Sequence, residues 1–271
     1  MRFPRPVRMS AIGNALRKPK LTWAAHSVRG AREDNQDTVM MTSPDQTGLV
    51  SKRGVLAVVC DGIGGEDGGA IASEVAASTA MRVFYASDAT DDATAVREAV
   101  SAANAAVREA AADHGLARMG TTIVMAVVTV EHVIVGHVGD SRAYLLCPNI
   151  ELRQLTSDHV EAGQMGLARS LGAIGRSDGD VVCEAFGPGT RLLLCTDGLY
   201  RALPQSAIAA CLSQHGTAET IVRDLVAAAF GNNSRDNISA AVIACDNATT
   251  RARNALHAVR GFVMRGRNQH D

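Results

Sequence analysis

Aromatic residues are scarce in this sequence: among 271 residues there are one Trp, three Tyr and five Phe. The core must therefore consist mainly of aliphatic side chains, and there are too few rings to form a platform on which nucleic-acid bases could stack. The formal net charge is only −1 at pH 7, so the chain as a whole is not attracted to nucleic acid or to an anionic membrane. We therefore expect no nucleic-acid partner.

Cysteine pairs and long apolar runs are also missing. The six cysteines lie far apart without a Cys-x-x-Cys pair, and most of them lie inside apolar runs, as buried free thiols do. This pattern is typical of a reducing compartment, so we expect a cytoplasmic protein. No apolar run reaches the roughly 18 residues that a membrane-spanning helix needs, and the N-terminus lacks the apolar stretch of a secretory signal. We predict no membrane span.

The length, with 46% hydrophobic and 20% charged residues, suits one large domain. Residues 1–20 contain six basic residues and no acidic one, whereas residues 246–271 contain five arginines and two aspartates. We interpret both ends as solvated segments rather than as contact arms for an acidic partner or a membrane. The prediction is a basic flexible leader at 1–20, a folded domain at 21–245 and a basic C-terminal tail at 246–271.

Hydrophobic periodicity predicts both strands and helices. The predicted strands are 21–27, 38–42, 55–60, 121–130, 132–138, 142–146, 191–195 and 238–244, and the predicted helices are 70–85, 94–113, 205–214 and 217–230. The strands come in groups and do not alternate strictly with helices. This order favours an α+β fold of packed antiparallel sheets flanked by helices over a doubly wound parallel sheet.

Four aspartates, Asp61, Asp140, Asp197 and Asp236, stand at the ends of strand-like apolar runs, and a small or polar residue follows each. Strand ends from distant parts of a chain can meet at one edge of a sheet. Clustered carboxylates repel one another and resist ionisation, so such a cluster favours bound divalent cations. No Cys or His lies at ligand spacing, which favours hard ions over zinc.

Glycines surround the first of these aspartates. A single Asp-Gly pair commonly forms only a tight turn. Here Asp61 ends a fully apolar run and opens the segment DGIGG at 61–65. Consecutive glycines allow the backbone to approach an ion or a phosphate, and the carbonyl of Gly62 can serve as an oxygen ligand.

Eight short segments stand in a characteristic order between about residue 22 and residue 244. They are 32–37 (REDNQD), 61–65 (DGIGG), 119–122 (MGTT), 139–144 (GDSRAY), 155–159 (LTSDH), 171–172 (LG), 194–199 (LCTDGL) and 236–239 (DNIS). Each is weak alone, but together they resemble the metal-dependent protein serine/threonine phosphatases, the protein phosphatase 2C family, in its bacterial form. The resemblance covers most of the chain.

This resemblance implies a four-layer αββα sandwich: two antiparallel sheets packed face to face, with helices on both outer faces and a catalytic domain over 21–245. It implies an enzyme that hydrolyses phosphoserine and phosphothreonine on proteins by direct attack of a metal-bridging water. Substrates would be phosphorylated proteins, and a Ser/Thr protein kinase would be the functional counterpart in signal transduction. We expect a monomer.

The resemblance also implies the roles of individual residues. Two Mn²⁺ or Mg²⁺ ions would be held, with Asp61 bridging them and Gly62 offering its carbonyl to one. Asp197 and Asp236 would hold the other ion. By the same resemblance, Asp140 would bind a third, weaker metal, and Arg32 would grip the substrate phosphate.

The sequence departs from the family pattern at three places. Gln36 stands where many relatives have a metal-binding Glu, and Ile63 stands where relatives have Met or a His proposed as general acid, so the general acid is unidentified. Only thirteen positions separate Asp158 from Leu171, where bacterial relatives fit a longer helical flap. We expect the shorter segment to open the site and to alter substrate choice or binding of the third metal.

Several alternatives compete with this interpretation. A catalytically weak or inactive phosphatase-fold module that recognises phosphoproteins would also match, as would a phosphatase of anti-sigma-factor antagonists, although residues 1–20 are short for the sensor region those enzymes often have. Ser141 as a protease-like nucleophile is disfavoured because Arg142 follows it and no G-x-S-x-G is present. A dinucleotide loop at 62–68 is disfavoured by its glycine spacing. For His159 a structural hydrogen bond is favoured over a proton shuttle.

Overall fold

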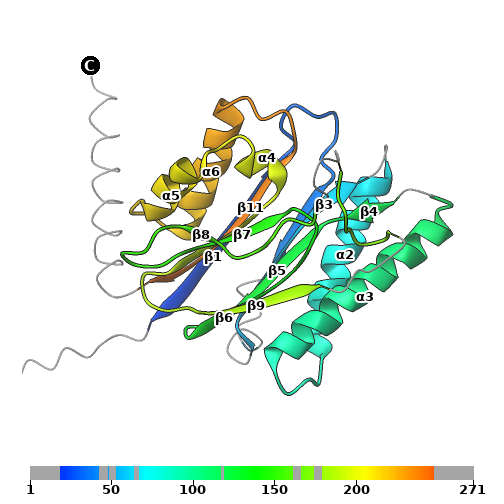
Figure 1. Ribbon diagram of the computed structural model, residues 1–271, viewed down its shortest axis with the longest axis horizontal. Helices are drawn as coiled ribbons and strands as arrows, with labels where there is room; N and C mark the ends of the chain where they lie inside the picture. Colours follow the sequence, from blue (N-terminus) through cyan, green and yellow to red (C-terminus); the bar gives the residue numbers. More distant parts are fainter. Residues whose placement is uncertain are drawn as a thin grey trace, which may run out of the picture.

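The computed structural model describes residues 19–42, 48, 53–63, 67–116, 119–160, 166–173 and 179–246. Within these ranges two antiparallel sheets lie face to face, with α2 (Asp67–Ala86) and α3 (Asp92–Asp113) on one outer face (Figure 1). On the other outer face lie α4 (Asp197–Tyr200), α5 (Gln205–Ser213) and α6 (Ala218–Gly231) (Figure 1). The predicted α+β sandwich is confirmed. Most of the predicted leader and tail lies outside the described residues, so the domain limits stay predictions.

Each sheet joins strands from distant parts of the chain. The first has the order β1-β11-β10-β7-β8, with β1 Lys20–Val28, β11 Ile238–Asp246, β10 Arg191–Cys195, β7 Arg142–Leu146 and β8 Arg153–Gln154. The second has the order β2-β3-β5-β6-β9, with β2 Asp37–Met41, β3 Val55–Ile63, β5 Ile123–Val128, β6 His132–Val138 and β9 Asp180–Ala185; β4 (Gly120–Thr121) pairs with β3.

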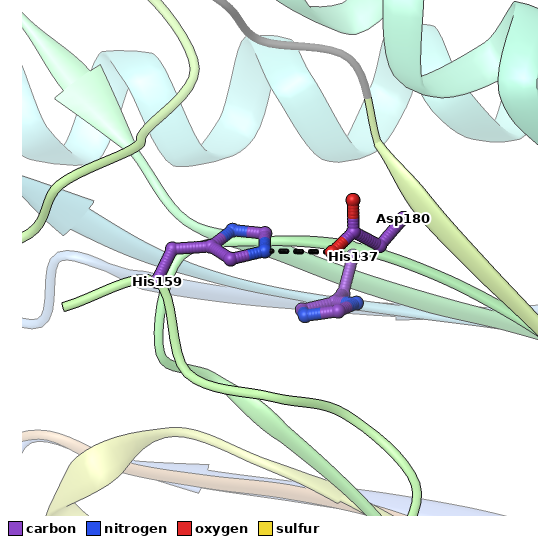
Figure 2. A group of neighbouring side chains, drawn as sticks. All are labelled: His137, His159 and Asp180. Carbon is purple, nitrogen blue, oxygen red and sulfur yellow. Dashed lines mark hydrogen bonds and ion pairs between the residues drawn. The ribbon is translucent and has the colours of Figure 1, made fainter.

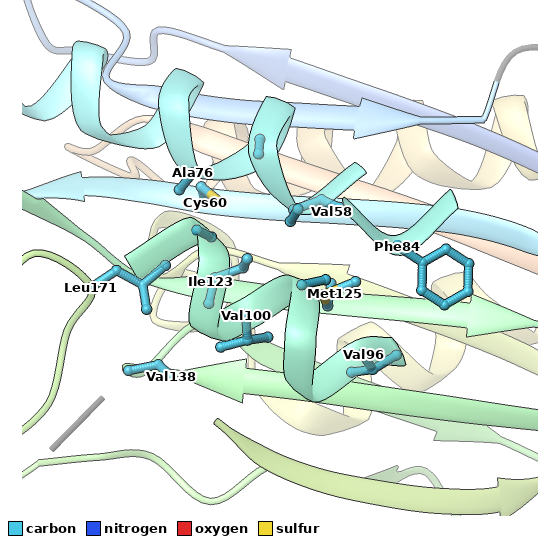
Figure 3. Close-up of a cluster of buried hydrophobic side chains, with 14 of the residues drawn as sticks. Val58, Cys60, Ala76, Phe84, Val96, Val100, Ile123, Met125, Val138 and Leu171 are labelled. Carbon is cyan, nitrogen blue, oxygen red and sulfur yellow. The ribbon is translucent and has the colours of Figure 1, made fainter. Parts of the chain in front are cut away.

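The central strand β3 is buried on both faces. Val55, Ala57 and Val59 pack between the two sheets, whereas Val58 and Cys60 pack against α2 and α3 (Figure 3). The same division occurs in β10, where alternate leucines face the other sheet and the α4–α6 layer. A strand buried on both faces is apolar at every position, which explains the unbroken apolar run before Asp61.

The predicted helices are present with small shifts at their ends. Asp91 caps α3 by accepting a hydrogen bond from the Thr94 amide, and Thr217 caps α6 by accepting one from the Thr220 amide, as its position in the sequence suggests. Gly231 was predicted just past the end of α6 but is its last residue, and Asn232 is the C-cap. Among the described helices, none combines the length and the apolar character that crossing a membrane requires.

Three short elements were not predicted. β9 contains only exposed and half-buried residues, and β8 has only two residues, both exposed, so neither produces a marked apolar pattern. The third, α4, is a single four-residue turn of helix that begins at Asp197. All six cysteines lie in described ranges, and no disulfide joins them, as predicted.

Replacement of Leu194 by Ala tests the inter-sheet core. The Leu194 side chain is fully buried between the two sheets, so its truncation leaves a cavity that the strands cannot close. We expect the free energy of unfolding to fall by about 2–5 kcal/mol, measured by urea unfolding. Val130→Ala, at an exposed position, is the control and should change it by less than about 0.5 kcal/mol. A similar small loss in both variants would contradict this packing.

Candidate functional site

The pairing of β2 with β3 places Asp37 directly opposite Asp61. The backbone of Asp61 is held by the MGTT segment: its amide donates to Thr122 Oγ1 at 2.9 Å, and its carbonyl accepts from Thr121 Oγ1 at 2.8 Å. Ser141 Oγ in turn lies 2.7 Å from Thr122 Oγ1, and Ser141 is buried. We therefore assign Ser141 a structural role and not that of a nucleophile. The threonines therefore fix the end of β3.

Gly62 lies where the backbone is crowded from two sides. A Cβ at this position would come within 2.2 Å of the Gly69 carbonyl oxygen and 2.6 Å of the Gln36 carbonyl oxygen. Any side chain would push apart β3, the start of α2 and the segment before β2. Glycine is therefore required here for close packing. Residues 64 and 65 of the same segment lie outside the described residues.

Asp197 and Asp236 come to the same place through the neighbouring strands β10 and β11. Asp197 begins α4 directly after Thr196, and Thr196 Oγ1 donates to Asp37 at 2.9 Å. Asp236 directly precedes β11, and the Arg32 guanidinium lies 2.8 Å from its carboxylate. These contacts link the ends of both sheets.

Asn237 was not predicted as a site residue, although it belongs to the DNIS segment. Its side-chain amide donates to the carbonyls of Arg29 and Asp34, both at 2.8 Å, and its Oδ1 accepts from the Gln36 amide at 2.9 Å. Asn237 thus shapes the loop between β1 and β2 that contains Arg32. The Asp-Asn pair in the sequence was the available signal.

Asp140 follows β6 and is buried. Its carboxylate lies 3.2 Å from the Arg201 guanidinium and accepts from the Tyr200 hydroxyl at 3.3 Å. Arg201 also lies 2.9 Å from Asp197. This arginine, which sequence reasoning missed, therefore bridges two of the predicted metal-binding carboxylates.

The carboxylates destabilise one another's ionised forms. Burial, followed by the charge of Asp37 and of the other aspartates, raises the pKa of Asp61 well above its ordinary value. Burial and the charges of Asp197 and Asp236 raise the pKa of Asp37 to about 7. Burial also raises the pKa values of Asp140 and Asp197. The four buried or half-buried acids thus form one electrostatic unit.

The structure brings together the predicted residues Asp61, Asp140, Asp197, Asp236 and Arg32, and Gly62 is adjacent to Asp61. In the described part of the chain, no three of these carboxylates bring oxygens within 4.8 Å of one another. Asp61 and Asp197 lie within hydrogen-bonding reach of each other, and the charge of Asp140 and Asp236 also acts on Asp61. An all-oxygen donor set whose members resist ionisation fits hard divalent cations such as Mg²⁺ or Mn²⁺.

A second network supports the Gly139–Asp140 turn. The Gly139 amide donates to Nδ1 of His159 at 3.1 Å, so Nε2 has the ring proton and donates to Asp180 at 3.0 Å (Figure 2). His137 stacks on His159 with 4.7 Å between ring centroids, and burial lowers its pKa. The predicted structural hydrogen bond of His159 is present.

The same three side chains have metal-compatible spacing, since His137, His159 and Asp180 each offer an atom within 4.8 Å of the others. However, the Nε2 proton of His159 blocks coordination. The Arg169 guanidinium also lies 3.0 Å from that nitrogen and 3.2 Å from Asp180, so a cation already balances the carboxylate. We assign this cluster to structural support.

The short segment from Asp158 to Leu171 forms no helix in its described residues. Val160 forms an isolated antiparallel β-bridge with Leu167, and Leu171 forms one with Thr121. Residues 161–165 lie outside the described ranges. At its start, Asp158 forms a two-pronged ion pair with Arg142, at 2.9 and 2.6 Å, and the guanidinium of Arg142 stacks 3.6 Å above the Tyr200 ring. The segment is thereby tied to the strand that follows Asp140.

The raised pKa of Asp37 predicts an unusual pH dependence in the metal-free protein. Between about pH 4 and pH 7 folded Asp37 retains a proton that the unfolded chain has lost, since its pKa rises from 3.8 to about 7. The free energy of unfolding should therefore fall as pH rises through this window. Urea unfolding in EDTA measures it. The free energy of unfolding of the Asp37→Asn variant should fall less steeply with pH. Equal slopes in the wild type and the variant would contradict the raised pKa of Asp37.

Comparison with known proteins agrees with the geometry. Residues 26–237 match the protein phosphatase 2C family. The serine/threonine phosphatase stp of Listeria monocytogenes is 31% identical over 220 residues, which are 70% of this chain and 84% of that protein. The structure of the S. agalactiae serine/threonine phosphatase has a TM-score of 0.73 and 25% identity, covering 83% of this chain and 99% of its own.

A further likeness shows the fold alone. The catalytic domain of the serine/threonine protein phosphatase PstP, solved with two manganese ions, has a TM-score of 0.72 at 24% identity, covering 84% of this chain and all of its own. The eight sequence segments, the two-sheet sandwich and the gathered aspartates agree with these matches. The chain belongs to the protein phosphatase 2C family.

Proposed function

We propose that the protein hydrolyses phosphoserine and phosphothreonine on phosphorylated proteins with the aid of divalent cations. The observation that supports this best is the set of carboxylates with raised pKa values, with an exposed arginine beside it. The similarity to stp, which is named a serine/threonine phosphatase, supports the substrate class. The two manganese ions of the PstP structure support the choice of cation.

In this proposal Asp61 and the Gly62 carbonyl would hold one cation, and Asp61, Asp197 and Asp236 would hold the second. Asp140 provides for a third, weaker ion. When bound, such ions would acidify a bridging water for in-line attack on phosphorus and neutralise the phosphoryl oxygens. Thr121, Thr122 and Asn237 keep the backbones of the ligand residues in place.

Arg32 is the proposed phosphate-binding residue. Its side chain is 59% exposed and touches Asp236. A cation bound by Asp236 would compete for that carboxylate and leave the guanidinium available to hold two phosphate oxygens at once. Arg32 thus orients the phosphoryl group against the centre. We also propose that a Ser/Thr protein kinase is the functional counterpart of this enzyme and that the protein is located in the cytoplasm.

Asp61→Asn tests the metal-dependent reaction. The amide removes the charge that the proposed ligand shares between both ions, so Mn²⁺-dependent hydrolysis of a phosphopeptide should fall to below about a thousandth of the wild-type rate. Addition of Mn²⁺ should raise the melting temperature of the wild type and not of this variant. Asp113→Asn, at an exposed position on α3, is the control. Wild-type turnover in EDTA would rule out the proposed chemistry.

Arg32→Ala tests the phosphate contact. Loss of charge-assisted hydrogen bonds should raise KM for a phosphopeptide by about ten- to a hundredfold, with a smaller effect on kcat. Arg32→Lys retains the charge without the two-pronged geometry and should lie in between. Steady-state kinetics with Mn²⁺ measure both. An unchanged KM in the alanine variant would remove Arg32 from the phosphate site.

The alternative function, a phosphoprotein-binding module without turnover, has a distinct outcome in these assays. Such a module would bind a phosphoserine peptide, measured by fluorescence anisotropy, but release no phosphate with Mn²⁺ or with Mg²⁺. We favour the enzyme because all four aspartates and Arg32 gather at one place.

A further inference from the structure

A cavity of about 280 Å³ opens beside the aspartate centre, between the start of α4 and the loop that follows α6. Asp197 and Asp236 form one side of it, so it adjoins the proposed metal centre. The remaining polar lining comes from Arg201, Arg235 and small polar residues of the loop. A group held in this cavity would therefore lie next to the phosphate that reacts.

Two hydrogen bonds connect the walls of this α4–α6 cavity. Ser234 Oγ donates to the Gly198 carbonyl at 2.8 Å, and Asn232 Nδ2 donates to the Ala202 carbonyl at 3.2 Å. Both bonds join the loop after α6 to the α4 segment. The cavity is thus a defined part of the fold.

The charges of the cavity favour an anion. In the proposed enzyme, Asp197 and Asp236 are neutralised by cations, which leaves two guanidinium groups and neutral polar side chains. Arg235 is exposed and has no ion-pair partner among the described residues. Arg201 pairs with Asp140 and Asp197, the same carboxylates that a cation would engage. A guanidinium without a carboxylate partner is a ready receptor for an oxyanion.

We propose that the α4–α6 cavity binds a second acidic group of the phosphoprotein substrate, through Arg235 with the aid of Arg201. This inference rests on the proposed function and names the substrate class of the same site. The ligand is an oxyanion, either the carboxylate of Asp or Glu or a second phosphate. Because the cavity borders the centre, the acidic group lies within about three residues of the hydrolysed phosphoserine, roughly 10 Å of extended chain.

The test compares three phosphoserine peptides of equal length. One has neutral neighbours, one has Asp or Glu within three residues, and one has a second phosphoserine there. With Mn²⁺, wild-type kcat/KM for one or both acidic peptides should exceed that for the neutral peptide by about tenfold, the effect of one hydrogen bond between charged groups. The two acidic peptides show which oxyanion the cavity prefers.

Arg235→Gln should reduce this preference to near unity by raising KM for the acidic peptides. Arg235→Lys should restore part of it, because the charge is kept. Arg223→Gln is the matched control, since Arg223 is an exposed arginine of α6 that pairs with Glu219, and it should keep the wild-type preference. Arg201 is not varied because it also contacts Asp140 and Asp197.

The same preference is measured as the Kd of fluorescently labelled peptides, so the result does not depend on turnover. Equal kcat/KM and equal Kd for all three wild-type peptides would overturn the inference while leaving the phosphatase function intact. A preference that survives in Arg235→Gln would also overturn it. Absence of hydrolysis for every peptide, together with a binding preference that Arg235→Gln abolishes, would instead reject the proposed function and support the cavity.

Discussion

Mutual repulsion among buried carboxylates is the constraint on which the organisation of this protein depends. Asp37 and Asp61 face each other across β2 and β3, and Asp197 and Asp236 come from the other sheet. Burial and proximity raise the pKa values of the first two, so the ionised set is unfavourable without positive charge nearby. The fold must hold these groups in place against that repulsion. Cations, whether guanidinium groups or divalent metals, offset it.

The fold meets this constraint by hydrogen bonds that hold the backbone beside the carboxylates, in addition to the contacts made by the carboxylates themselves. Two threonines hold the end of β3, Asn237 holds the loop between β1 and β2, and His159 exchanges hydrogen bonds with the Gly139 turn. The threonines bond the backbone of Asp61, whereas the Asn237 backbone amide also donates to Asp236 Oδ1 at 2.9 Å. The two-sided burial of β3 gives these anchors a rigid base.

Three arginines stand around the acidic centre, each in a different relation to it. Arg32 contacts Asp236 from the β1–β2 loop, Arg201 bridges Asp140 and Asp197 from the C-cap position just after α4, and Arg235 lines the neighbouring cavity. Because the three arginines lie in separate segments, positive charge surrounds the negatively charged centre and faces an anionic substrate. In our proposals, Arg32 binds the reacting phosphate, whereas Arg235, with the aid of Arg201, binds an acidic group of the peptide substrate beside it.

The sequence alone predicted the layers, most strands and helices, and a candidate centre of four aspartates with Arg32, because alternation, helical period and ordered short segments are local patterns. It missed β9, an edge strand with no fully buried residue, and it missed Asp37 as the partner of Asp61. Only the tertiary structure decided which charges meet. Thr196 reaches Asp37 across 159 positions and Arg201 joins Asp140 to Asp197. Such contacts depend on strand order and register, which no local pattern encodes.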